Sequence, residues 1–230
     1  MTDVEAVTDG VVAGPVGPSS GTTSAARLKA ARELRRLGNA LVSHQVDDAV
    51  LEEITARLGT LTPLVEAAPE RTHAFLASGA DFFASRPKGH RAEADEGFFP
   101  DCIVSGLANP MGMEARLQMD GDEAVMEVTL GAAFEGAPGR AHGGVVAALI
   151  DETMGLVLSI TETLAFTGKL AVSYRAPTPL GLPITARARL SHQSGRRLTI
   201  TAELRSHDTL LAEAEGLFIA VDPAHFLSQG

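Results

Sequence analysis

The stretch that most constrains the fold of this chain runs from residue 143 to residue 160. Residues 145–160 are almost wholly apolar, and the preceding segment 136–140 contains glycines and a proline that suit neither a helix nor a central strand. A helix is therefore predicted to begin at Gly143 or Gly144. Because this helix is apolar on every side, it has to be buried, and the rest of the chain has to cover it.

A carboxylate, Asp151, lies inside this apolar helix. An ionised carboxylate in a core is costly without a partner, so its presence favours a chemical role. The amides of the first helical turn have no acceptor within the helix and can polarise a carbonyl group, and glycines allow close approach to the backbone. Gly143 and Gly144 are therefore candidate anion-stabilising residues; the alternative is tight packing of the helix start against a strand. Glu152 competes with Asp151 but points about 100° away around the helix.

Composition narrows the class of protein. The chain has 230 residues, of which 45% are hydrophobic, enough for a real core. Its formal net charge of −10 argues against a broad nucleic-acid surface. The single cysteine, Cys102, excludes an internal disulfide framework and a cysteine-rich zinc site, and no metal-ligand spacing is found, so no metal and no cofactor are expected. An acidic N-terminus and the lack of a long uninterrupted apolar run predict a cytoplasmic protein without a membrane span.

The first part of the chain is predicted to be separate from the rest. Residues 1–23 are rich in Gly, Pro, Ser and Thr and are expected to form a disordered tail. Residues 24–90 are expected to form a helical extension, with helices from the cap Ser24, from Asp47 to about Leu61, and from residue 69 or 70 to residue 85. Pro63 is expected to interrupt or restart the second helix.

Five basic residues lie between Arg27 and Arg36 in the first of these helices. They raise two interpretations, a DNA-reading helix and an ordinary solvated helix face. Residues 1–94 are not net basic, so the solvated face is favoured and no nucleic-acid partner is expected.

The second part of the chain, residues 91–230, alternates with the period of strands on both sides of the apolar helix. Strands are predicted at 113–119 and 124–130, joined by a hairpin turn at 120–122, and then at 164–176, 183–193, 197–207 and 210–221 as a meander. This order predicts one antiparallel sheet wrapped around one helix, an α+β fold. Such a sheet has exposed edges, which favours an oligomer that continues the sheet across a dimer axis.

Three motifs, together with the order of strands and helix along the chain, resemble the hotdog-fold acyl-CoA thioesterases, in particular the phenylacetate-pathway (PaaI-like) and THEM-type branch. They are His142-Gly143-Gly144 with Asp151 nine residues after the histidine, the segment 102–113 containing Asn109-Pro110, and the strand end 172–181 with its proline-rich turn. The segment departs from the family pattern in having Met113 for leucine and Ser105 where a second cysteine is common. The resemblance covers about residues 97–222 and implies a hotdog fold, an antiparallel sheet around a long central helix. The helical extension lies outside it.

The resemblance also implies roles for individual residues. The acidic residue matching Asp151 activates water or attacks the thioester, commonly in a site completed by a neighbouring subunit. Thr167, sixteen residues further on, matches a position whose hydroxyl orients the water or the carboxylate; otherwise it is an ordinary strand threonine. His142 suits positioning of the loop or thioester better than proton transfer. Asn109 either hydrogen-bonds near the carboxylate or stabilises its own turn, and the turn is favoured.

Coenzyme A carries phosphates, so local cations are needed to bind it. Arg140, Lys169 and Arg175 are candidates, with the Arg196-Arg197 turn, although each alone is an ordinary solvated charge. Phe166 is a candidate for lining the acyl pocket. The acyl group itself is left open, and so is the choice between a homodimer and a dimer of dimers.

The sequence thus predicts a cofactor-independent acyl-CoA thioesterase. Two other classes stay open. One is a non-catalytic acyl-CoA sensor in which the helical extension is the effector part. The other is a hotdog hydratase or dehydratase, although the loop pattern of those relatives is not found in this chain.

Overall fold

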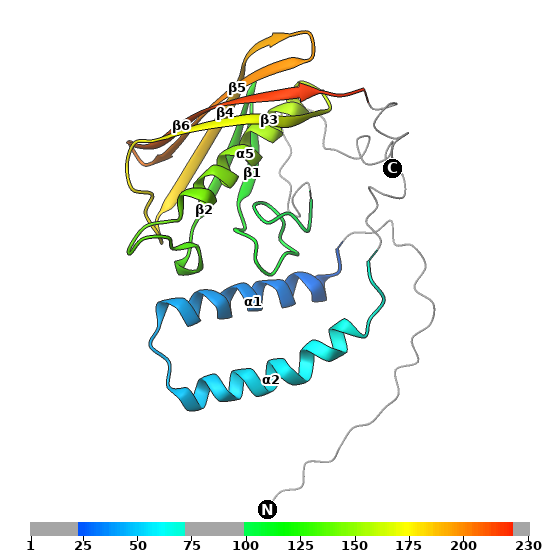
Figure 1. Cartoon of the computed structure of the whole chain (residues 1–230), viewed down its shortest axis with the longest axis vertical. Helices are drawn as coiled ribbons and strands as arrows, with labels where there is room; N and C mark the ends of the chain where they lie inside the picture. Colours follow the sequence, from blue (N-terminus) through cyan, green and yellow to red (C-terminus); the bar gives the residue numbers. More distant parts are fainter. Residues whose placement is uncertain (1–22, 72–98, 223–230) are drawn as a thin grey trace, which may run out of the picture.

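A computed structural model describes residues 23–71 and 99–222 of the chain (Figure 1). The predicted tail, the predicted third helix and the last eight residues lie outside these ranges, apart from residue 23 of the tail and the first residues of that helix. The described elements are α1 (Ala25–Ser43), α2 (Asp48–Glu66), β1 (Arg116–Asp120), β2 (Glu123–Thr129), the short 3-10 helix η1 (Ala132–Phe134), α5 (Gly143–Ile160), β3 (Ala165–Tyr174), β4 (Pro183–Ser194), β5 (Arg197–Ser206) and β6 (Thr209–Ala220).

The strands form one antiparallel sheet of six strands in the order β1-β2-β4-β5-β6-β3. The predicted fold class, an antiparallel sheet around a long helix, is confirmed. The predicted meander is only partly correct, because β4, β5 and β6 are consecutive neighbours but β3 lies beyond β6 at the edge of the sheet. Helix α5 comes between β2 and β3 in the chain, and β4 takes the place beside β2.

Helix α5 forms the centre of the core. It begins at Gly143, as predicted, and it lies across one face of the sheet (Figure 1). Leu149, Ile150 and Met154 on this helix are fully buried. Gly216 on β6 faces Met154, and a Cβ atom there would come within 2.7 Å of the methionine sulfur. The glycine therefore lets the helix approach the sheet closely. By length and composition α5 could cross a membrane, but here half of it is buried as a core helix.

Helix α1 is fixed to the sheet domain by polar contacts. Ser24 caps it by accepting a hydrogen bond from the Arg27 amide, as predicted. Arg35 is 7% exposed, donates to the carbonyl oxygens of Leu107 and Asn109, and pairs with Glu114 at 2.7 Å. Since Arg27 also pairs with an acidic residue of the sheet domain, Asp101, the prediction of a wholly solvated basic face was wrong for these two arginines.

Helix α2 lies beside α1 on the side away from the sheet (Figure 1). It starts at Asp48 and continues through Pro63 to Glu66, so the prediction that Pro63 interrupts it was wrong. A proline in a helix removes only its own amide hydrogen bond and crowds one preceding carbonyl, which an exposed helix near its end tolerates. None of the residues of α2 is buried.

Candidate active site

The start of α5 is capped by the residue before it. His142 has an extended backbone, and its Nδ1 accepts a hydrogen bond of 3.0 Å from the Gly144 amide. Both following amides, of Val145 and Val146, donate to the His142 carbonyl. The expectation of two free glycine amides is therefore corrected. Gly144 donates to the histidine, and only the Gly143 amide has no acceptor among the described residues.

The cap also fixes the histidine. Because Nδ1 accepts the Gly144 amide, the neutral ring carries its hydrogen on Nε2, an assignment that follows from the hydrogen-bond pattern. The His142 amide donates to the Phe134 carbonyl, which holds the loop against η1. These contacts support the predicted positioning role, since a histidine that takes up a proton at Nδ1 would lose its cap.

A tyrosine that the sequence interpretation missed lies beside the helix start. The Tyr174 hydroxyl, at the end of β3, donates to the Gly143 carbonyl at 2.8 Å. The ring is 54% exposed and covers Gly143, where an added Cβ would lie 3.4 Å from the hydroxyl oxygen. In the sequence, the signal that could have identified Tyr174 was its position at the end of a strand, just before the proline-rich turn.

Asp151 lies two turns into α5 and faces β3. Its side chain is half-buried, not fully buried as the sequence suggested. The Thr167 hydroxyl donates to Asp151 Oδ1 at 2.9 Å, so the structure brings these two predicted residues together. Oδ2 has no hydrogen-bond partner among the described residues, which leaves one carboxylate oxygen for a water molecule or a substrate.

A β-bulge in β3 makes this contact possible. Thr167 pairs with Phe218 of β6 and the next pair is Lys169 with Leu217, so Gly168 is an extra residue without a partner. Side chains alternate along a strand, and without the bulge Thr167 and Leu170 would lie on opposite faces. With it, Thr167, Leu170 and Val172 all face α5, so the strand supplies both a hydroxyl to Asp151 and apolar cover to the core.

Glu152, the competing carboxylate, has a structural role. It accepts hydrogen bonds from the Ser105 hydroxyl at 2.7 Å and from the Cys102 thiol at 3.4 Å. Ser105 is 1% exposed, so Glu152 satisfies a buried hydroxyl and holds the irregular segment before β1 against α5. The two adjacent carboxylates thus face different elements, which favours Asp151 as the chemical one.

Asn109 belongs to its own turn, as favoured in the sequence interpretation. Its side-chain nitrogen donates to the Asp101 carbonyl at 2.9 Å, and its side-chain oxygen accepts from the Met111 amide at 2.8 Å. Both ends of the amide are therefore used within the segment before β1. Its placement among the substrate-binding candidates is not supported by this geometry.

The other candidate binding residues are spread around the site. Arg175 is paired with Glu213 of β6, which lowers its availability for a phosphate. Arg140 is exposed beside the helix entry and has no ion pair among the described residues. The register of β3 puts Lys169 and Phe166 on the face of the sheet turned away from α5 and Asp151, which was not expected. Phe166 is 45% exposed there.

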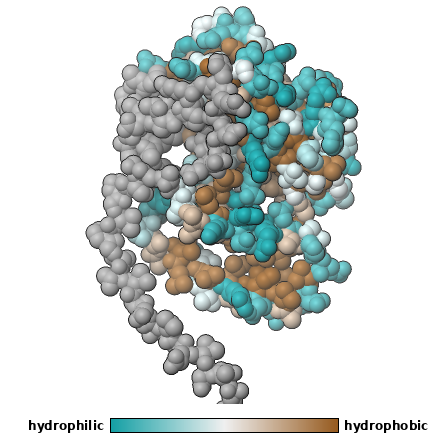
Figure 2. Space-filling model, turned by 180° about the vertical axis from the view of Figure 1, so that it is seen from behind, coloured by the Kyte–Doolittle hydropathy of each residue, from teal (hydrophilic) through white to brown (hydrophobic). Residues whose placement is uncertain are grey.

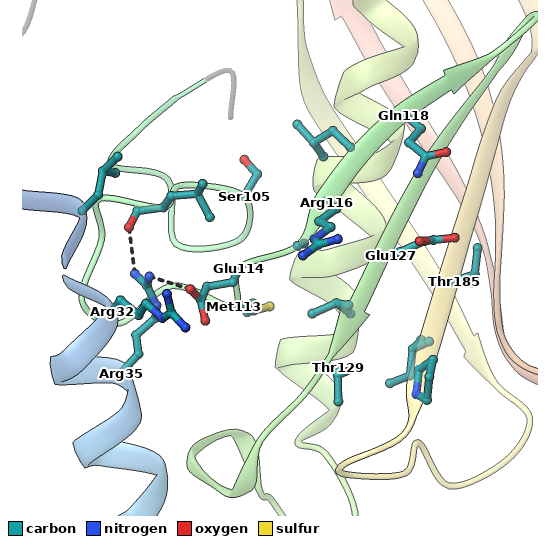
Figure 3. A pocket seen from close by; sticks show the side chains of 17 residues that line it. Arg32, Arg35, Ser105, Met113, Glu114, Arg116, Gln118, Glu127, Thr129 and Thr185 are labelled. Atoms are coloured by element: carbon teal, nitrogen blue, oxygen red, sulfur yellow. Dashed lines mark hydrogen bonds and ion pairs between the residues drawn. The ribbon is translucent and has the colours of Figure 1, made fainter. Parts of the chain in front are cut away.

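A cleft of about 1070 Å³ lies elsewhere in the molecule (Figure 3). It is bounded by α1, the segment before β1 and one end of β1, β2 and β4, with Arg32, Arg35, Glu114, Arg116 and Glu127 among its lining residues. None of the predicted catalytic residues lines it. The predicted carboxylate, hydroxyl and helix start lie instead at the surface between α5 and β3.

The fold and this surface together define a class of protein. An antiparallel sheet wrapped around one long helix, with a carboxylate two turns into that helix, is the architecture expected of a hotdog-fold domain. Residues 138–213 match the family model described as the thioesterase superfamily. The sheet domain thus has the hotdog fold, and residues 138–213 are similar to the thioesterase superfamily.

Comparison with curated proteins finds acyl-coenzyme A thioesterases. The chain is 38% identical over 92 residues to acyl-coenzyme A thioesterase THEM4 of Mus musculus, covering 39% of this chain and 40% of the relative. It is 34% identical over 125 residues to THEM4 of Bos taurus, and this match covers 53% of this chain and 52% of the relative. The matches thus span about half or less of these relatives.

A solved structure matches more of the chain. The crystal structure of a thioesterase superfamily protein aligns with a TM-score of 0.70 and 26% identity, covering 88% of this chain and 93% of the other. The sheet domain makes up little more than half of the chain, so a match of this extent includes part of the helical extension.

Proposed function

We propose that this protein hydrolyses acyl-CoA thioesters to a free acid and CoA. The observation that carries the proposal is the half-buried carboxylate of Asp151, held by the Thr167 hydroxyl at 2.9 Å and leaving one oxygen without a partner. The match of residues 138–213 to the thioesterase superfamily and the similarity to THEM4 support the same reaction.

In this proposal the start of α5 binds the thioester carbonyl oxygen. The Gly143 amide lies at the positive end of the helix dipole and stabilises the negative charge that develops on that oxygen. The Nε2 hydrogen of His142, the residue before Gly143 in the chain, is the proposed second donor. Tyr174 holds the Gly143 carbonyl and so fixes the orientation of this turn.

The carboxylate then supplies the second part of the reaction. As a general base, Asp151 Oδ2 takes a proton from water, the resulting hydroxide adds to the carbonyl carbon, and the C–S bond breaks to release CoA thiolate. As a nucleophile, it forms an acyl anhydride that water cleaves afterwards. Thr167 holds Oδ1 in both schemes, which leaves Oδ2 to face the water molecule as a base or the carbonyl carbon as a nucleophile.

The proposed substrate site is completed by a second subunit at β3. This strand is at the edge of the sheet, and most of its residues are exposed. Among the described strands only β6 pairs with β3, and the outer edge of such a strand is a ready surface for pairing with the same strand of another copy. Such a dimer would cover Asp151 and bring residues on the far face of β3, Lys169 and Phe166, near the partner's surface.

Thiol release from a panel of short, long, branched and aryl CoA thioesters tests the function. Release from one class with saturation kinetics is expected. Binding of acyl-CoA without release would instead identify a sensor. Single turnover in ¹⁸O-labelled water tests the nucleophilic scheme, because ¹⁸O in the Asp151 side chain identifies an anhydride that water cleaves at the aspartyl carbon. Label in the acid alone fits a general base or cleavage of the anhydride at the acyl carbon.

A further inference from the structure

The cleft between α1 and one end of β1, β2 and β4 is separate from Asp151 and Thr167, neither of which lines it. Its volume of about 1070 Å³ is at the upper end of the range for small-molecule sites, so it has room for a ligand of many atoms and not only for a single ion. Figure 3 shows that Arg32 and Arg35 extend from α1 on one side of it and Arg116 from β1 on the other. The proposed thioester chemistry uses none of these residues.

The side of α1 that lines the cleft differs from the other sides of this helix. Leu28, Arg32 and Arg35 recur at helical spacing and share the face toward the cleft. Leu34 and Leu41 are 44% and 37% exposed on another face of the helix. Figure 2 shows hydrophobic residues gathered at the end of the molecule that α1 and α2 form. Helix α1 therefore presents two arginines and one leucine to the cleft, whereas its exposed aliphatic residues lie elsewhere.

The wall of the cleft contains a buried arginine beside a strained residue. Arg35 is 7% exposed, and its Nη atoms donate to two carbonyl oxygens and to Glu114. Its Nε is buried without a hydrogen-bond partner among the described residues. Glu114 has a backbone φ of 56°, in the left-handed region that a glutamate seldom adopts. Buried polar groups with incomplete pairing and strained backbone both cluster where ligands bind, so this wall has the character of a binding site.

The charges along the cleft favour an anion. Three arginines and two glutamates line it and give a net charge of +1, whereas the whole chain carries −10. Arg35 pairs with Glu114 at 2.7 Å, but Arg32 and Arg116 have no ion pair among the described residues. Glu127, the residue opposite Arg116 in β2, offsets part of this positive charge. A positive cleft on an acidic protein attracts anions that the rest of the surface repels.

We propose that this cleft binds a small amphipathic anion, a carboxylate or phosphate group on an apolar body. Arg32 and Arg116 supply guanidinium groups from opposite walls, and guanidinium groups bind the paired oxygens of both kinds of anion. The hydroxyl groups of Thr129 and Thr185 line the cleft without a hydrogen-bond partner among the described residues and supply further donors. Leu28, half-buried one turn before Arg32, contacts the apolar body.

The apolar body belongs to the proposal because a bare anion would leave much of the cleft to water. Leu107 and Met113, from the segment before β1, line the cleft together with Leu28. An aliphatic chain against these side chains removes apolar surface from water on both partners. A nucleic acid is disfavoured, because the net charge of −10 repels an extended phosphate backbone beyond the cleft.

Hydrogen–deuterium exchange of the full chain tests the proposal, with octanoate and octyl phosphate as probes. Both anions are expected to slow amide exchange in peptides from α1 and β1, and comparison of the two distinguishes a carboxylate from a phosphate ligand. Octanol and octylamine have the same apolar body with no charge or with a positive charge. They are expected to leave exchange in α1 and β1 unchanged.

A pair of matched variants tests the arginines. Arg32→Gln/Arg116→Gln changes two exposed side chains and keeps them polar, so the fold is expected to be retained, which circular dichroism checks. A hydrogen bond to a charged group contributes enough free energy that the anion concentration for half-maximal protection of α1 is expected to rise by about tenfold or more. The control Lys29→Gln/Arg36→Gln removes the same charge from exposed positions on another face of α1 and should leave that concentration unchanged.

The cleft and the proposed active site are distinguished by Asp151→Asn, which should show the same protection of α1 and β1 as the wild-type chain. A chain that releases no thiol but retains this protection would reject the thioesterase reaction and leave the cleft site intact. Protection confined to α5 and β3, equal protection by octylamine or octanol, or an unchanged affinity in Arg32→Gln/Arg116→Gln would each overturn the proposed site.

Discussion

Helices α5 and α2 have nearly the same length, 18 and 19 residues, and both are rich in aliphatic side chains, yet one is the core and the other buries nothing. The difference lies in what surrounds them. A sheet of six strands covers α5, whereas among the described elements only α1 lies beside α2. Apolar composition alone therefore does not decide burial; the number of elements that can reach a helix does. Variants in the two helices can test this contrast.

The largest expected effect is chemical and falls on α5. Replacement of Asp151 by Asn removes the base or nucleophile while keeping the hydrogen bond to Thr167, so thiol release is expected to fall by about 10²–10⁴-fold with an unchanged melting temperature. Glu152→Gln is the matched control on the neighbouring residue and should retain most of the rate. Equal loss in both variants would contradict the assignment of the two carboxylates to different roles.

The next effect concerns packing. Leu149 is fully buried at the centre of α5, so Leu149→Ala is expected to lower the free energy of unfolding by about 2–5 kcal/mol, through lost apolar burial and the cavity that remains. Denaturant titration followed by circular dichroism measures it. A decrease in the free energy of unfolding of less than about 1 kcal/mol would show that α5 is packed less tightly against the sheet than the structure indicates.

A smaller effect is expected where β3 meets α5. Thr167→Val keeps the shape of the side chain but removes the hydroxyl that donates to Asp151. A hydrogen bond to a charged group contributes about 1.5–3 kcal/mol, so kcat is expected to fall by about 10–100-fold, with a smaller change in KM. Thr167→Ser restores the donor and should recover the rate. A Ser variant as slow as the Val variant would point to packing of the methyl group.

The smallest effect is expected in α2. Leu64 is 68% exposed, so Leu64→Ala should change the free energy of unfolding of the dissociated chain by less than about 0.5 kcal/mol. Measurement over a range of protein concentrations sharpens the contrast with Leu149. A cost that grows with protein concentration would show that association covers Leu64, because association stabilises the folded chain. A large cost at low concentration would mean that α2 is already covered within one chain.

The sequence predicted the local elements well because their signals are local. The glycine start of α5, the Ser24 cap of α1 and the bounds of the last strands follow from side-chain periodicity and turn residues. The place of β3 at the sheet edge could not be predicted in this way, because alternation along a strand tells which side chains share a face but not which strand lies next to it.

The candidate site was predicted in part. Asp151 and Thr167 were chosen as a pair, and the structure brings them to 2.9 Å. The capping of Gly144 by His142 was missed, although a histidine two residues before an amide of the first helical turn can accept from it. The face of Lys169 was missed because the bulge at Gly168 changes the alternation of β3 after Thr167. Phe166 precedes the bulge, and simple alternation already puts it on the face opposite Thr167.

The same bulge has a consequence for how this strand can vary. Gly168 is one inserted residue, and it reverses which side chains of β3 face the core and which face away after that point. Deletion of Gly168 would turn either Thr167 away from Asp151 or Leu170 and Val172 away from the core, and no single side-chain replacement would repair it. Residues before Gly168, such as Thr167, can change with the chemistry of the site. Residues after it, such as Leu170 and Val172, can change with the packing of the core. The two parts of the strand can therefore vary independently as long as the extra residue remains.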